Sequence, residues 1–184
     1  GLELADSLGA SRFKPFLLIY IARIRFARGE GADESVKLMR EALDLARQTG
    51  ASFLAPWVLS TLALVCEDRE TALEALAGGE ELLTEGCVGH NYYAFYRNAI
   101  EVSLHYRNWP EVERYAAALA AYSADEPLPW SEFLCARGRA LAASGRGERS
   151  DANLRELERL RTEATAAGLN APLAAIQQAL DAAA

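Results

Sequence analysis

The sequence is poor in the residues on which many functions depend. It has two histidines and three cysteines in 184 residues, and its only lysines are Lys14 and Lys37. The formal net charge of -7 argues against a nucleic-acid partner, which requires clustered positive charge, and against an anionic membrane surface. No apolar run approaches the roughly 20 residues that a membrane span needs. The N-terminus has no basic-then-apolar signal pattern. We therefore predict a cytoplasmic chain without nucleic-acid or membrane partners.

Motifs for catalysis, metal binding and nucleotide binding are missing as well. Cys66, Cys87 and Cys135 are widely spaced and form no Cys-x-x-Cys pair, which favours buried thiols in a reducing compartment. A phosphate-binding loop needs a lysine before a hydroxyl residue, but the two lysines are followed by Pro15 and Leu38. Two histidines leave few options for a nucleophile and its base. We predict no catalytic residues, no metal and no cofactor, and hence that this chain is not an enzyme.

What the sequence does contain is an internal repeat. Residues 2–18 recur 41 positions later as 43–59, in a chain that is 51% hydrophobic and rich in alanine and leucine. A fixed period of this size is typical of stacked helical hairpins, and such arrays present a binding surface. The matching pairs include Gly9-Ala10-Ser11 with Gly50-Ala51-Ser52, and Pro15-Phe16 with Pro56-Trp57.

Glycines and prolines punctuate the predicted helices. Glycine at the end of a helix can adopt the left-handed C-cap conformation, and proline is tolerated in the first helical turn. We therefore predict C-caps at Gly9, Gly50, Gly86 and Gly168, helix starts at Pro15, Pro56, Pro129 and Pro172, and N-caps at Ser11 and Ser52. The helices that we expect span 2–8, 12–28, 32–49, 53–66, 69–85, 90–107, 109–123, 129–144, 148–167 and about 171 to the end.

This order of helices predicts an all-α chain: an α-solenoid of about four antiparallel hairpins with terminal helices. Residues 108–115 (NWPEVERY) resemble the turn and second helix of the tetratricopeptide motif, although the 41-residue spacing is longer than the roughly 34 of that motif. No segment alternates with the period of a half-buried strand. We find no linker and predict a single tetratricopeptide-like domain over residues 1–184, cut from a larger protein.

Candidate binding residues gather in the middle of the chain. Arg97, Glu101 and His105 recur every four residues, so they share one face of a helix. A mixed-charge stripe of this kind is most often a solvated face; the alternative is a row that reads a ligand on the inner surface of the solenoid. The dense cluster of aromatic residues at 92–96 cannot all face one side of a helix, so some of these rings are expected at an interface. The complete candidate surface comprises Arg97, Glu101, His105, Glu132, Arg139, Tyr92 and Tyr93.

Two stretches carry a family resemblance. Residues 86–101 (GCVGHNYYAFYRNAIE) and 126–133 (EPLPWSEF), running into 136–142 (ARGRALA), resemble the C-terminal repeat region of large bacterial signalling proteins. Those proteins join a class III adenylate/guanylate cyclase domain and a signal-transduction ATPase to a tetratricopeptide-like tail. The resemblance implies a non-catalytic regulatory role here, with a protein or peptide, or other domains of the same polypeptide, as partner. None of the cyclase's metal-binding aspartates can be placed on these residues.

Other functions remain open from the sequence. The same type of repeat also occurs in transcription regulators that combine an ATPase with a helix-turn-helix domain. A third possibility is a small-molecule sensor in which the groove closes around a metabolite. An exposed charged row at Arg97, Glu101, Glu132 and Arg139 would favour a peptide or polar ligand, whereas a closed apolar pocket would favour a metabolite.

Overall fold

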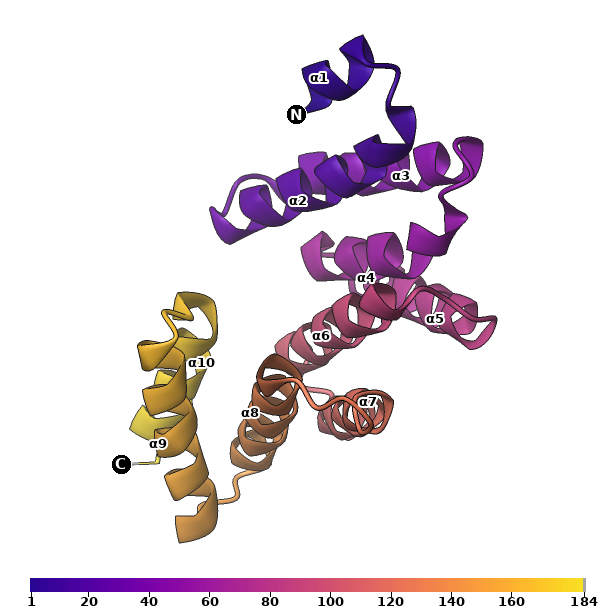
Figure 1. Cartoon of the computed structure of the whole chain (residues 1–184). Helices are drawn as coiled ribbons and strands as arrows, with labels where there is room; N and C mark the ends of the chain where they lie inside the picture. The colour runs from indigo at the N-terminus through magenta and orange to yellow at the C-terminus, as the bar shows by residue number, and fades with distance from the viewer. Residues whose placement is uncertain (184) are drawn as a thin grey trace. The chain divides into compact units, whose positions relative to one another are not determined.

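The computed structural model describes residues 1–183, and all regular secondary structure in that range is helical (Figure 1). The chain divides into two compact units, Gly1–Val102 and Ser103–Ala184. The expected all-α class is confirmed. The α-helices are α1 Leu2–Ser7, α2 Lys14–Ala27, α3 Ala32–Gln48, α4 Ala55–Val65, α5 Arg69–Thr84, α6 Gly89–His105, α7 Trp109–Tyr122, α8 Pro129–Gly145, α9 Asp151–Ala166 and α10 Asn170–Asp181.

The first unit consists of neighbouring helix pairs. Helix α2 packs against α3 and α4 against α5, α3 contacts α4, and α2 also contacts α4 (Figure 1). Its core includes the fully buried side chains of Leu18, Ile19, Met39, Val58 and Phe95. In the second unit α7 packs against α8, α8 against α9, and α9 against α10, around Leu119, Leu157, Leu160 and Ile176.

The internal repeat is also a repeat of backbone structure. Gly9 and Gly50 have left-handed φ values of 64° and 69°, and each ends a helix as predicted. Short 3₁₀ helices follow at Ser11–Phe13 and Ser52–Leu54, and each leads into a helix with proline in its first turn. The same sequence pattern, 41 positions apart, therefore forms the same turn twice.

The predicted N-caps at Ser11 and Ser52 are wrong. Both serines lie inside the 3₁₀ helices, and the N-cap positions of α2 and α4 are Phe13 and Leu54, which make no side-chain capping bond. In the second unit, the helix expected from residue 148 begins at Asp151, because the Ser150 hydroxyl accepts a hydrogen bond from the Asn153 amide at 3.2 Å.

Gly79 lets the first unit pack closely. It lies buried within α5, and a Cβ atom there would approach Cε2 of Phe95 to 2.7 Å and Cβ of Leu59 to 3.3 Å. Its neighbour Gly78 has more room, since the nearest atom to a Cβ added there would be Cδ1 of Leu59 at 3.9 Å. The two adjacent glycines therefore have different roles, and only Gly79 is required by the packing of α6 on α5.

Gly79→Ala should destabilise the protein by about 1–3 kcal/mol, because the Phe95 ring must shift in a filled core. Gly78→Ala should be neutral or stabilising by up to about 1 kcal/mol, since alanine favours the helix more than glycine does. Chemical denaturation of the two variants and the parent measures both effects. Equal changes in unfolding free energy for the two variants would contradict this assignment.

Candidate functional site

The mixed-charge row of α6 does not form a uniformly solvated face. Glu101 and Arg97 are both half-buried, whereas His105, the last residue of the helix, is exposed, with its ring centroid 4.8 Å from that of Tyr106. Arg97 lies beside a second arginine, Arg23 of α2, at a position that the sequence did not indicate. The site described below is the arginine cluster, defined as Arg23, Arg97 and Asn98.

Asn98 is the centre of the arginine cluster. Its side chain is fully buried, and its Oδ1 accepts hydrogen bonds from Nη1 of Arg23 at 2.7 Å and from Nε of Arg97 at 3.3 Å. Its Nδ2 donates to the hydroxyls of Ser60 and Thr61 on α4, each at 3.2 Å. One amide side chain therefore joins polar groups of α2, α4 and α6.

The hydroxyls under Asn98 are themselves fixed. Ser60 Oγ and Thr61 Oγ1 donate to the backbone carbonyl of Trp57 at 3.0 and 2.9 Å, and both side chains are fully buried. Since each hydroxyl hydrogen is used toward Trp57, the oxygen lone pairs face Asn98 as acceptors. This arrangement sets the orientation of the Asn98 amide, with its nitrogen toward α4 and its oxygen toward the arginines.

Two guanidinium groups thus share one neutral acceptor. Burial lowers the pKa of Arg97 to about 10, and the neighbouring charge of Arg23 acts in the same direction, while Glu101 and Tyr20 act in the opposite direction. The pKa of Arg23 is also lowered, mainly by burial. Nη2 of Arg97 is buried and donates no hydrogen bond. Glu101 alone does not neutralise two positive charges, so the cluster carries excess positive charge.

Aromatic rings adjoin the arginine cluster in the first unit. The Trp57 ring makes edge-to-face contacts with Phe16, Tyr20 and His90 at centroid distances of 5.8–5.9 Å. Trp57 is buried, and its Nε1–H has no hydrogen-bond partner. Tyr20 is 53% exposed, and Ile24, one turn further along α2, is 52% exposed. An accessible apolar strip on α2 therefore borders the positive charge.

The predicted tyrosines lie in the first half of α6. Phe95 of the same aromatic run is fully buried in the core, while Tyr92 and Tyr93 are half-buried. The Tyr92 hydroxyl donates to the Leu83 carbonyl at 3.0 Å, which ties it to the end of α5. Tyr92 therefore has a structural contact within the first unit.

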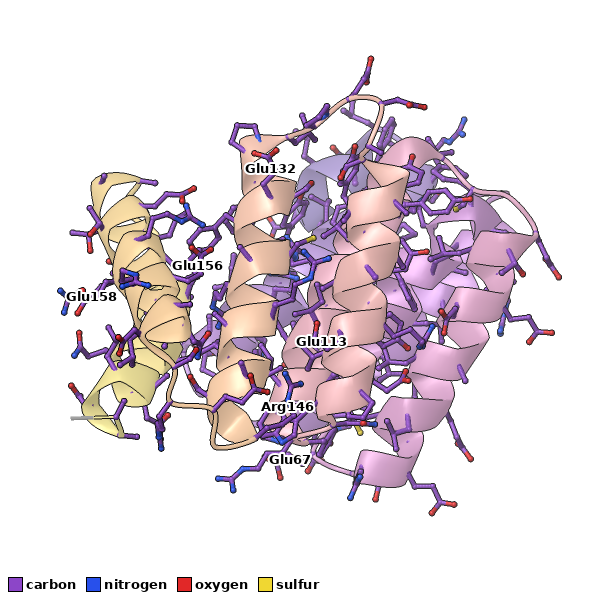
Figure 2. The ribbon with its side chains drawn as sticks, turned by 90° about the horizontal axis from the view of Figure 1, so that it is seen from below. Glu67, Glu113, Glu132, Arg146, Glu156 and Glu158 are labelled. Carbon is purple, nitrogen blue, oxygen red and sulfur yellow. The ribbon has the colours of Figure 1, made fainter. Side chains whose placement is uncertain are left out.

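The remaining predicted residues, Glu132 and Arg139, belong to the second unit. Both line a cavity of about 420 Å³ formed by α7, α8, α9 and the segment before α8. Arg139 Nε lies 3.9 Å from Glu113, and Arg146 lies 3.3 Å from the same carboxylate. Figure 2 shows Glu113 and Arg146 near one end of α8 and Glu132 at the other end. The arginines here have carboxylate partners, unlike Arg97.

The sequence indicated Arg97 and Glu101 but not Arg23, Asn98, Ser60 or Thr61. The sequence did contain one signal for Thr61. The 41-residue repeat places Thr61 at the position equivalent to Tyr20, and thus on the equivalent face of its helix. Nothing in the sequence joined Arg23 to Asn98, which are 75 positions apart.

Comparisons with known protein families, with curated proteins and with solved structures find no match to this chain. Within residues 1–183, no group of three or more histidine, cysteine or acidic side chains is placed to hold a metal ion. No helix in the same range has the length and apolar character of a membrane span.

The pKa of Arg97 predicts an unusual stability effect. A folded-state pKa of about 10, well below the ordinary value of an arginine, means that the charged form is disfavoured by folding. This cost is fully present below pH 10 and disappears as the pH rises from there toward the ordinary pKa of arginine. Arg97→Met should therefore raise the unfolding free energy at pH 7 by about 1–2 kcal/mol, since it removes a charge and keeps an apolar stem.

The contrasting variant is Asn98→Ala, which leaves two guanidinium groups and two hydroxyls without their shared partner. It should destabilise by about 2–4 kcal/mol. Urea denaturation at pH 7 measures both changes. A loss of stability for Arg97→Met similar to that for Asn98→Ala would show that Arg97 is well compensated in the folded protein.

Proposed function

We propose that the chain is a tetratricopeptide-like α-solenoid region that binds a protein or peptide segment and performs no chemistry. The repeat supports the solenoid, because residues 2–18 and 43–59 share both sequence and backbone structure. Packing supports it too: α2 contacts α4 and α8 contacts α10, so alternate helices meet within each unit. Stacked hairpins bring alternate helices together in this way.

The observation that carries the binding function is the half-buried pair of Arg23 and Arg97, which a buried polar network on three alternate helices holds in place. Arg23, Thr61 and Asn98 come from α2, α4 and α6, each the first helix of a proposed hairpin. In a solenoid the first helices line one continuous surface, which is the surface that such proteins use for partners. The exposed Tyr20 beside this network offers a rigid ring with a hydroxyl, a common anchor in interfaces.

The resemblance to bacterial cyclase proteins suggests the setting of this region. As the C-terminal tail of such a protein, it would regulate an attached adenylate/guanylate cyclase, and its partner could be another domain of the same polypeptide. A bound segment would act by favouring one arrangement of the attached catalytic domain. The alternative parent is a transcription regulator with an ATPase and a helix-turn-helix domain. The full coding sequence of the gene distinguishes the two parents directly.

A small-molecule sensor is the second candidate function. The observation that favours it is the cavity of about 420 Å³ in the second unit, whose lining includes Ser131 with a buried hydroxyl that has no hydrogen-bond partner. A pocket of this size is within the range used for small ligands. We prefer peptide binding to small-molecule sensing, because the lining of this cavity mixes charged residues such as Glu132 and Arg139 with apolar ones.

Selection of the chain against a displayed library of random peptides should enrich sequences that bind saturably. Tyr20→Ala should weaken binding of an enriched peptide at least about tenfold, equivalent to about 1.4 kcal/mol. Tyr122→Ala is the matched control, since Tyr122 is also exposed but lies on α7 in the other unit. Fluorescence anisotropy with a labelled peptide measures both. Failure to enrich any peptide, or equal effects of the two variants, would contradict the proposal.

The chain should neither bind nucleoside triphosphates tightly nor convert them. It lacks a phosphate-binding loop, and its net charge of -7 repels polyphosphate. Calorimetry with ATP and GTP in the presence of magnesium checks binding, and chromatography checks for cyclic nucleotide. Micromolar affinity or any cyclic product would reveal a nucleotide site in this chain.

A further inference from the structure

We propose that the arginine cluster binds a carboxylate of the partner peptide, held between Arg23 and Arg97 and oriented by Asn98. This binding mode rests on the proposed function and names the chemistry that the site recognises. The carboxylate is that of an aspartate or glutamate side chain, or of the peptide's C-terminus, and the neighbouring peptide residue is aromatic or aliphatic.

The region around the cluster has unused hydrogen-bond capacity. Nη2 of Arg97 is buried without a partner, and the same is true of Nε1 of Trp57. Buried donors are nearly always satisfied in folded proteins, so two of them in one region call for a missing acceptor. Tyr20 lies next to both groups, because its ring packs on Trp57 and it interacts electrostatically with Arg97. The ligand must therefore bring acceptors.

The charge of the cluster points to an anion. The protein has more acidic than basic residues, 26 against 19, yet among the residues that the structure describes Glu101 is the only carboxylate that acts on the pKa of these two guanidinium groups. By contrast, Arg159 pairs with Glu156 and Glu163, both at 2.7 Å. Although the chain is rich in carboxylates, Arg23 and Arg97 together with Glu101 carry one formal positive charge in excess. A bound anion would supply the negative charge that the folded chain does not place beside the two arginines.

The local charge balance favours carboxylate over phosphate. Two arginines and Glu101 leave a local charge of about +1, which one carboxylate neutralises, whereas a phosphate dianion would leave a net local charge of about -1. Guanidinium groups bind carboxylates through paired N–H donors, and Nη2 of Arg97 is such a donor without a partner.

The exposed apolar strip would bind the aromatic or aliphatic peptide residue next to the carboxylate. Ile24 follows Arg23 directly in α2, and Tyr20 lies one turn earlier, so both border the charged group from the same helix. A peptide whose acidic residue is next to an aromatic or aliphatic one would bury the apolar side chain here. This arrangement explains why an accessible isoleucine and tyrosine lie beside half-buried arginines.

Small ligands that mimic parts of a peptide test the inference on the whole chain. The probes are N-acetyl-phenylalanine, with a terminal carboxylate, N-acetyl-aspartyl-phenylalaninamide, with a side-chain carboxylate, the neutral N-acetyl-phenylalaninamide and inorganic phosphate. Two-dimensional ¹H–¹⁵N NMR follows the Nε–Hε signals of Arg23 and Arg97 during millimolar titrations. At least one carboxylate should shift both signals saturably, and the one that binds more tightly identifies the source. The neutral amide should not shift them.

Variants separate this inference from the general proposal. Arg97→Met, which is expected to fold, should weaken carboxylate binding at least about tenfold, whereas Arg40→Met, an exposed position on α3, should leave it unchanged. Asn98→Asp places a carboxylate inside the cluster and should also abolish binding.

Tighter binding of phosphate than of either carboxylate would overturn the choice of ligand, and equal responses to the neutral and charged probes would overturn the site. If library peptides bind but Arg97→Met has no effect on them, the carboxylate inference fails while the binding function stands. If no peptide is enriched yet the carboxylates bind at Arg97, the peptide function fails and an anion site remains.

Discussion

The first unit depends on one fully buried amide. An asparagine side chain can make four hydrogen bonds, and Asn98 makes all four, two to arginines and two to hydroxyls. Because these partners include residues of α2 and α4, the amide fixes where α6 lies against both helices. An apolar residue at this position would allow α6 to slide along its neighbours; the amide allows one register, since any shift would leave buried polar groups unsatisfied.

The same amide brings two like charges together. Hydrogen bonding to a shared neutral oxygen does not remove the repulsion between Arg23 and Arg97, and burial lowers the pKa of both. The second unit shows the usual solution, in which Glu113 lies between Arg139 and Arg146. Sequences normally agree with their fold at every level, and the exceptions concentrate where function requires them. The arginine cluster departs from this agreement, and this distinguishes it from Arg139 and Arg146, which share the Glu113 carboxylate.

The fold could be predicted from the sequence to a large extent, and the site only in part. Helix boundaries follow from local signals, such as the left-handed glycines Gly9 and Gly50, and the repeat reproduces the turn between helices. The prediction of serine caps is wrong because a 3₁₀ turn and a capped α-helix share the same small polar residues at their start. Spacing within α6 identified Arg97 and Glu101, but spacing cannot show which residue of a distant helix faces them. Arg23 became part of the site only through three-dimensional packing.

A ligand at the arginine cluster would bridge helices that are far apart in sequence. Arg23 belongs to the first helix pair and Arg97 to α6, and in the unbound chain their mutual repulsion opposes the contact that Asn98 imposes. A bound carboxylate would reverse the sign of that interaction, because each guanidinium would then be attracted to the same anion. Binding would therefore stabilise the stacking of α2, α4 and α6 in addition to occupying the surface. A domain attached to this region would then contact a stiffer first unit in the bound state than in the unbound state. Coupling between two sites requires such a difference between the two states.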